Sequence, residues 1–171
     1  MIRLIGRSVA ISNVLCLAPL AFSTCLAGED QPKIQEHLLE NSKLLSEEEL
    51  KKLSATSEEL VIDGQSLTMG VSLWRDFMPP STGSPLHAAV IVMLKEGKFK
   101  DKSPDFNRIW VVNGKFVWES KLERTGSTGF GAGGGPKWEV GTDVFIVLEI
   151  IEKDGKRKQV KISKLKIMRT S

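Results

Sequence analysis

The stretch 109-IWVVNGKFVW-118 decides the fold class of this chain, because an Asn-Gly pair separates two apolar runs. A two-residue type I′ turn needs two residues that tolerate positive φ, and Asn-Gly is the strongest local signal for it. With Asn113 and Gly114 as the turn, we expect Val111 opposite Phe116 and Ile109 opposite Trp118. The stretch therefore predicts a β-hairpin with a fixed register.

The same register predicts which side chains of the hairpin face the core. Side chains alternate between the two faces of a strand. The face expected in the core holds Ile109, Val111, Phe116 and Trp118. The opposite face carries Lys115 and a predicted Arg108–Glu119 pair, so we expect it to be at least half exposed. It also holds Trp110, Val112 and Val117.

Alternating and apolar runs on either side of this hairpin predict further strands. Residues 66–73 alternate polar and apolar side chains, and Asp63-Gly64 predicts a turn back to residues 60–62. Residues 86–94 are apolar on both faces and rich in β-branched side chains, as in a central strand.

The last two runs, 143–152 and 157–163, predict a second hairpin. A three-residue loop with Gly155 in the left-handed region places Leu148 beside Val160 and Ile146 beside Ile162. The final strand, residues 160–168, carries Lys161, Lys164 and Lys166, which is typical of an exposed sheet edge.

About seven strands without a helical crossover predict an all-β fold, an antiparallel β-sandwich over residues 60–171. In strand number and spacing it resembles immunoglobulin-like and fibronectin-type domains, and Trp118 is then the expected core tryptophan. The chain has no tyrosine, so the tyrosine corner common in such folds is impossible. A resemblance of fold alone implies no function.

The N-terminal residues 1–27 have the layout of a secretory signal peptide. A basic start with Arg3 and Arg7 precedes a mostly apolar run, and small residues precede a cleavage site before Gly28. We therefore expect an exported protein, periplasmic or extracellular, without a transmembrane segment in the mature chain. The alternative is a lipoprotein anchored at Cys25. Both cysteines of the chain lie in this leader, which leaves the mature part without a thiol.

Residues 28–59 form an acidic N-terminal extension that we expect to be partly helical. Ser46 followed by Glu49 is a capping-box pattern at the start of a short helix. Few residues here are suited to a core. The segment is predicted to be a loosely attached extension, with a spacer or a docking segment for a partner as the alternative.

Residues 125–136, TGSTGFGAGGGP, are expected to form a flexible glycine-rich loop. Three of the glycines match G-x-G-x-x-G, but Pro136 and a strand pattern follow where a phosphate site needs a helix. A mobile loop that closes on a partner, with Phe130 and Trp138 as anchors, is the alternative.

The leading functional hypothesis is a non-enzymatic interaction module that binds a protein or a cell-envelope polymer. Exposed aromatic rings are typical of binding surfaces. The predicted surface consists of Trp110, Val112, Val117, Trp74, Phe130 and Trp138. No residue is assigned a catalytic, metal-binding or cofactor-binding role, and no cofactor is expected. With 24 basic against 21 acidic residues, a nucleic-acid partner is not expected either.

Two alternatives to this hypothesis stay open. One is a glycan-acting enzyme or accessory factor with carboxylates near the glycine-rich segment. The candidate acids of the chain include Asp76, Asp105 and Glu119, which are expected in turns or in cross-strand pairs. The other is a periplasmic copper carrier that uses His87 and Met78, because imidazole and thioether groups suit copper.

Overall fold

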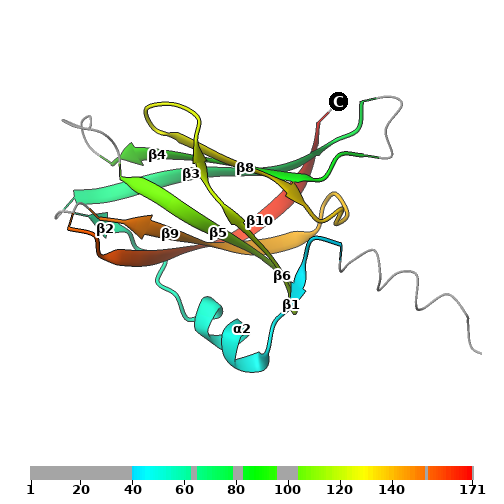
Figure 1. Ribbon diagram of the computed structural model, residues 1–171, viewed down its shortest axis with the longest axis horizontal. Helices are drawn as coiled ribbons and strands as arrows, with labels where there is room; N and C mark the ends of the chain where they lie inside the picture. The colour runs from blue at the N-terminus through cyan, green and yellow to red at the C-terminus, as the bar shows by residue number, and fades with distance from the viewer. Residues whose placement is uncertain (1–39, 63–64, 79–82, 96–103, 153, 171) are drawn as a thin grey trace, which may run out of the picture.

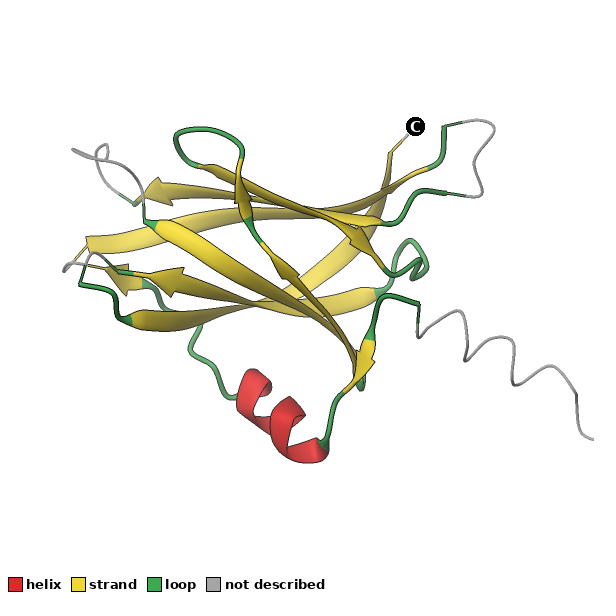
Figure 2. Ribbon diagram, in the orientation of Figure 1, coloured by secondary structure: helices red, strands yellow, loops and turns green. Residues whose placement is uncertain are grey.

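The computed structural model describes residues 40–62, 65–78, 83–95, 104–152 and 154–170. These residues form an all-β protein with one helix against one side of the strands (Figures 1 and 2). The elements are β1 (Lys43–Leu44), α2 (Glu47–Ser54), β2 (Val61–Ile62), β3 (Gln65–Asp76), β4 (Leu86–Leu94), β5 (Asp105–Asn113), β6 (Phe116–Lys121), β7 (Glu123–Arg124), β8 (Gly129–Gly135), β9 (Asp143–Ile151) and β10 (Arg157–Thr170).

The ten strands form a single curled sheet in the order β1-β6-β5-β9-β10-β3-β4-β8-β7, with β2 beside β3. The sheet folds over into two layers, β6, β5 and β9 in one and β3, β4 and β8 in the other (Figure 1). Strand β10 runs from one layer to the other. Only Leu122 separates β6 from β7, so the chain also passes between the layers there and nearly closes the curl.

The sheet is mixed, which corrects the expected antiparallel arrangement. Strand β10 is antiparallel to β9, but its last four residues pair in parallel with β3, Ile167 opposite Leu73. A bulge between Ile162 and Leu165, with Lys164 at φ 60°, redirects the strand. The expectation that β10 is a free edge up to its end is therefore wrong. Ile167 is 1% exposed, and its burial accounts for the inward course of this end.

The hairpin of β5 and β6 forms, but its pairing differs from the prediction by two residues. Val111 lies opposite Trp118 and Val112 opposite Val117. The two central turn residues are Gly114 and Lys115, and of these only Gly114 has positive φ, 57°. That fits a type II′ turn, which needs glycine only at its first central position. A shift of two residues keeps every side chain on its predicted face.

Two other predicted pairings are confirmed. Leu148 lies opposite Val160 and Ile146 opposite Ile162, with Gly155 at φ 81° in the connecting loop. Strand β2 pairs antiparallel with the start of β3, while the turn predicted at residues 63–64 lies outside the described residues.

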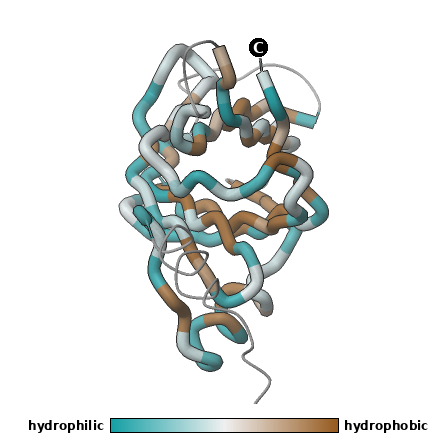
Figure 3. Tube along the Cα trace, turned by 90° about the vertical axis from the view of Figure 1, so that its right-hand side faces the viewer, coloured by the Kyte–Doolittle hydropathy of each residue, from teal (hydrophilic) through white to brown (hydrophobic). Residues whose placement is uncertain are grey.

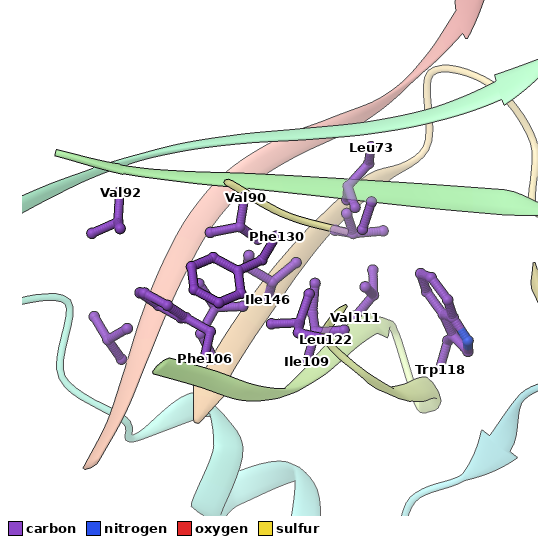
Figure 4. Packing of buried hydrophobic residues seen from close by; sticks show 14 of the residues in the cluster. Leu73, Val90, Val92, Phe106, Ile109, Val111, Trp118, Leu122, Phe130 and Ile146 are labelled. Atoms are coloured by element: carbon purple, nitrogen blue, oxygen red, sulfur yellow. The ribbon is translucent and has the colours of Figure 1, made fainter. Parts of the chain in front are cut away.

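The main core lies between the two layers (Figure 4). Side chains of β3, β4 and β8 meet those of β5, β6 and β9, and the rings of Phe106 and Phe130 pack with their centroids 5.0 Å apart. Trp118 is 3% exposed and belongs to this core, as predicted. In Figure 3 the colour changes along the trace between hydrophobic and hydrophilic, whereas the sequences of β4 and β9 are apolar over most of their length.

A second, smaller core lies on the outer face of β5, β6 and β9. It consists of Leu45, Leu53, Val112, Val117 and Val147, with Leu50, Trp110 and Phe145 packed against it. The predicted capping box is present: the Ser46 hydroxyl accepts a hydrogen bond from the Glu49 amide, and Glu49 accepts one from the Ser46 amide. The described part of the N-terminal extension thus covers a sheet face of its own chain.

The segment predicted as a flexible glycine-rich loop contains strand β8, which pairs with β4 and β7. Gly135 lies where a Cβ atom would come within 2.8 Å of the Trp118 ring and 2.9 Å of Leu86. Glycine at this position permits close packing of the backbone against an indole ring. The loop prediction is therefore corrected for residues 129–135.

The expected signal peptide, residues 1–27, and residues 28–39 of the extension lie outside the described residues. Among the residues that the structure describes, no helix has the length and apolar character needed to span a membrane.

Candidate functional site

Four of the six residues predicted to form a binding surface lie in the interior. Val112, Val117, Phe130 and Trp138 are each 1–2% exposed, so the exposure expected for them is wrong. The helix α2 and Leu45, which precedes it, cover the two valines. Phe130 faces the main core because the glycine-rich segment is a strand with alternating side chains rather than a loop.

Trp138 is part of the packing at one end of the core. Its carbonyl oxygen accepts a hydrogen bond of 3.0 Å from Nη1 of Arg75, a side chain that also donates to the carbonyls of Ser84 and Lys137. Arg75 is only 6% exposed, and burial lowers the pKa of its guanidinium. Among the described residues, the indole nitrogen of Trp138 has no hydrogen-bond partner. The Arg75 side chain thus links β3 to the segment before β9.

Trp110 is half-buried at the margin of the second core. The guanidinium of Arg108 lies 5.8 Å from the centre of its ring, and Arg108 also forms the predicted ion pair with Glu119. Part of this ring remains accessible beside the helix, so its role in binding stays a prediction.

Trp74 lies on the other side of the molecule, on the outward-facing side of β3. It is half-buried and stacks on His87 of β4, with ring centroids 5.7 Å apart and 20° between the planes. Met168 of β10 is the parallel partner of Trp74 and is 47% exposed. Trp74 thus joins a short row of uncharged side chains across three strands.

This row belongs to a larger uncharged surface, which we call the β3–β4–β8 face. It comprises eleven outward-facing residues in the middle of these three strands, between Ser66 and Asp76 of β3: Thr68, Gly70, Ser72 and Trp74 of β3; His87, Ala89, Ile91 and Met93 of β4; and Gly129, Gly131 and Gly133 of β8. Asp, Glu, Lys and Arg are absent from these eleven positions. Ile91 and Met93 are each 50% exposed. Burial of such side chains in a complex would be favourable.

The face has one ridge and one open groove. Ile91 stands between Gly70 on β3 and Gly129 on β8. On the β8 side, the Thr125 side chain fills the space beside Gly129, where a Cβ atom would meet its hydroxyl at 2.9 Å. On the β3 side, a Cβ atom on Gly70 would meet nothing within 4 Å. The floor over Gly70 is therefore open next to the exposed Ile91.

Nothing in the described part of the chain explains the glycine at position 70. Its φ lies outside the left-handed region, its pairing with Ile91 is regular, and the space above it is empty. A glycine inside a strand costs stability, and it often marks a place where another backbone or a ligand approaches closely. Gly70 therefore points to an external contact.

The charged side chains that the alternatives would use are engaged within the chain. Asp105 pairs with Arg124, Glu119 pairs with Arg108, and Asp76 accepts a hydrogen bond from the Met78 amide. Within the described ranges, no group of three or more His, Cys, Asp or Glu residues is placed to hold a metal ion. The glycan-acting and copper-binding alternatives have no further support and stay predictions.

The basic strand β10 is largely neutralised by neighbouring carboxylates. Lys158 lies 2.8 Å from Glu152, and Lys166 lies 3.2 Å from Asp143. The Lys161 ammonium donates a hydrogen bond to the carbonyl of Ser54, the last residue of α2. These carboxylates lower the net positive charge that β10 would offer to an anionic polymer.

The apolar character of residues 86–94 was the sequence signal for the β3–β4–β8 face. Residues 86–94 are apolar at both odd and even positions, which predicted a strand buried on both faces. In the structure only one face is buried, and Ile91 and Met93 remain exposed on the other.

The fold and this surface define a small all-β protein with an uncharged sheet face. Comparison with known proteins adds no name to this description: no protein-family model, curated protein or solved structure matches the chain.

Proposed function

We propose that this protein is an exported, non-enzymatic interaction module that binds a protein or a cell-envelope polymer through the β3–β4–β8 face. Its export depends on the signal peptide expected at residues 1–27. The resemblance to immunoglobulin-like or fibronectin-type domains stays a prediction from strand number and spacing, and the proposed function does not require it.

One observation carries the proposal: a sheet face without charged residues exposes Ile91 and Met93 on a chain in which 26% of residues are charged. Scattered exposed apolar side chains are normal, but a contiguous uncharged surface favours an interface. The stacked Trp74 and His87 at one end add aromatic area, which binding surfaces favour.

The opposite side of the molecule supports this choice of surface. There, α2 and Leu45 of the same chain already cover the apolar side chains of β5, β6 and β9. The predicted surface around Trp110 is therefore mostly occupied. In the proposal, Trp74 is the predicted residue that keeps its binding role, and Ile91 and Met93 replace the buried valines.

The test is affinity capture of the C-terminally tagged protein from the envelope of its native host. Wild type is compared with Ile91→Asp, which places a charge in the middle of the face. The matched control is Val140→Asp, because Val140 is 41% exposed and lies in the segment between β8 and β9.

Proteins and sugars that co-purify are quantified for all three variants. We expect at least one of them to be lost with Ile91→Asp and retained with Val140→Asp. Equal recovery from both variants, or no enrichment with wild type, would overturn the proposed surface.

A further inference from the structure

We propose that the partner of the β3–β4–β8 face is a second copy of this chain, which packs face to face about a two-fold axis along β3 and β4. This inference rests on the proposed function, because it names the partner of the same surface. It follows from the charge, the relief and the register of the face.

The first argument is electrostatic. A two-fold interface brings the same residues of both copies together, so a charged surface would meet its own charge. The eleven positions of the face carry no Asp, Glu, Lys or Arg, and charged residues, Asp76, Lys95 and Glu123, follow only at its borders. Such a face can pack on itself without repulsion between like charges at its centre.

The second argument is the fit between ridge and groove. Gly70 and Ile91 are directly opposite each other on β3 and β4. An axis that runs along the strands between them places Ile91 of each copy over Gly70 of the other. Packed sheets lie about 10 Å apart with interdigitating side chains. An isoleucine side chain over a bare glycine fills that space from one side.

The same axis gives reasonable partners for the neighbouring positions. Met93 of one copy lies over Thr68 of the other, and Ala89 lies over Ser72, because these residues are also cross-strand pairs. At the far end, His87 lies near Trp74, where both rings are already stacked. The two half-exposed side chains of β4 are thereby buried, and small residues face them.

A neutral sugar polymer is the weaker occupant for this face. Sugar binding favours an aromatic ring whose flat side is open, but one side of the Trp74 ring is stacked against His87. The exposed Ile91 and Met93 offer a sugar hydroxyl only the weak thioether acceptor of Met93. An apolar protein surface suits them better.

The experiment measures self-association of the C-terminally tagged full chain, purified from its host, by sedimentation at concentrations from about 1 µM to about 500 µM. The decisive variant is Gly70→Thr, which fills the groove. Threonine suits a strand, and the space at Gly70 is open, so the variant is expected to fold. Gly126→Thr is the matched control, because Gly126 is also exposed and open but lies in the loop before β8.

We expect wild type and Gly126→Thr to form dimers, and Gly70→Thr to raise the dissociation constant at least about tenfold without lowering the melting temperature extrapolated to the monomer. Dimers that tolerate Gly70→Thr would overturn the inference, because the interface would then lie elsewhere.

A wild-type chain that stays monomeric over the whole range would also overturn it. In that case the capture experiment separates the two proposals. Loss of another protein or a sugar with Ile91→Asp would leave the proposed function standing with a different partner. Unchanged capture would overturn both.

Discussion

The two outer faces of this curled sheet differ in whether the chain covers them. The face of β5, β6 and β9 carries Val112, Val117 and Val147, and the chain covers it with its own α2 and Leu45. The face of β3, β4 and β8 carries Ile91 and Met93, and the described part of the chain leaves them half exposed. An apolar face that a protein needs only for stability can be covered internally. An apolar face that stays exposed to water either binds another molecule or lowers the solubility of the protein.

The residues beside the apolar side chains sharpen this difference. On the covered face, bulky neighbours such as Leu50, Trp110 and Phe145 complete a small core. On the open face, the neighbours are glycine, alanine, serine and threonine, which leave the exposed side chains standing above the sheet. The first arrangement is that of an interior, and the second suits a surface that another molecule completes.

The largest expected effect comes from matched truncations on the two faces. Leu53→Ala removes a side chain that is 9% exposed in the covered core, and we expect a loss of about 2 kcal/mol in the free energy of unfolding. Ile91→Ala should cost less than about 0.5 kcal/mol in the monomer, because its side chain is already half in water. Urea unfolding at a protein concentration where the chain is monomeric measures both values.

Equal costs for the two truncations would contradict the distinction between the faces. A small cost for Leu53→Ala would mean that α2 contributes little to the fold. A large cost for Ile91→Ala in the monomer would mean that the β3–β4–β8 face is covered within the chain.

A pair of glycine substitutions gives an intermediate effect. At Gly135 a methyl group would meet the Trp118 ring at 2.8 Å, so Gly135→Ala should destabilise the fold by about 1–3 kcal/mol through overpacking. At Gly70 a methyl group meets nothing, so Gly70→Ala should stabilise the monomer by up to about 1 kcal/mol. Thermal unfolding of both variants should shift in opposite directions.

Shifts in the same direction would indicate that the two strand glycines serve the same purpose. Opposite shifts would separate a glycine that the core requires from one that the fold itself does not require. The second kind is the stronger indication of an external contact.

The sequence predicted local elements better than it predicted which sheet faces are covered by distant parts of the chain. The Asn113-Gly114 hairpin, the loop at Gly155 and the Ser46–Glu49 capping box are signals carried by adjacent residues, and all three elements form. The pairing of the first hairpin differed because Gly114 took the first turn position, with only one residue at positive φ. Trp118 still faces the core, since a two-residue shift preserves the faces.

Long-range features had no comparable signal. The parallel pairing of Ile167 with Leu73 joins residues more than ninety positions apart and depends on the bulge near Lys164. In the same way, the burial of Val112 and Val117 depends on a helix that lies about sixty residues earlier in the chain. The binding role first given to those valines therefore failed for a tertiary reason, although their position on the strand was correct.

The glycine-rich segment shows how composition misled the prediction. Glycine disfavours strands, so residues 125–136 were expected to be a loop. Strand β8 forms because β4 and β7 supply hydrogen bonds on both sides, and because Phe130 and Gly135 pack into the core. Tertiary contacts have outweighed a weak local preference.

The smallest expected effect concerns the attachment of the cover itself and its dependence on pH. Hydrogen bonds from the Lys43 ammonium and from the amide and hydroxyl of Ser46 lower the pKa of Glu49 from 4.5 to about 2. Because this pKa is lower in the folded state, ionised Glu49 stabilises α2 fully above about pH 4.5. The stabilisation is lost as the pH falls toward 2. We expect amide signals of α2 in NMR spectra to titrate with a midpoint near pH 2, and Glu49→Gln to abolish that titration. A midpoint near 4.5 in wild type would show that the capping interactions are weak in solution, and that α2 is held over β6 and β9 by its leucines alone.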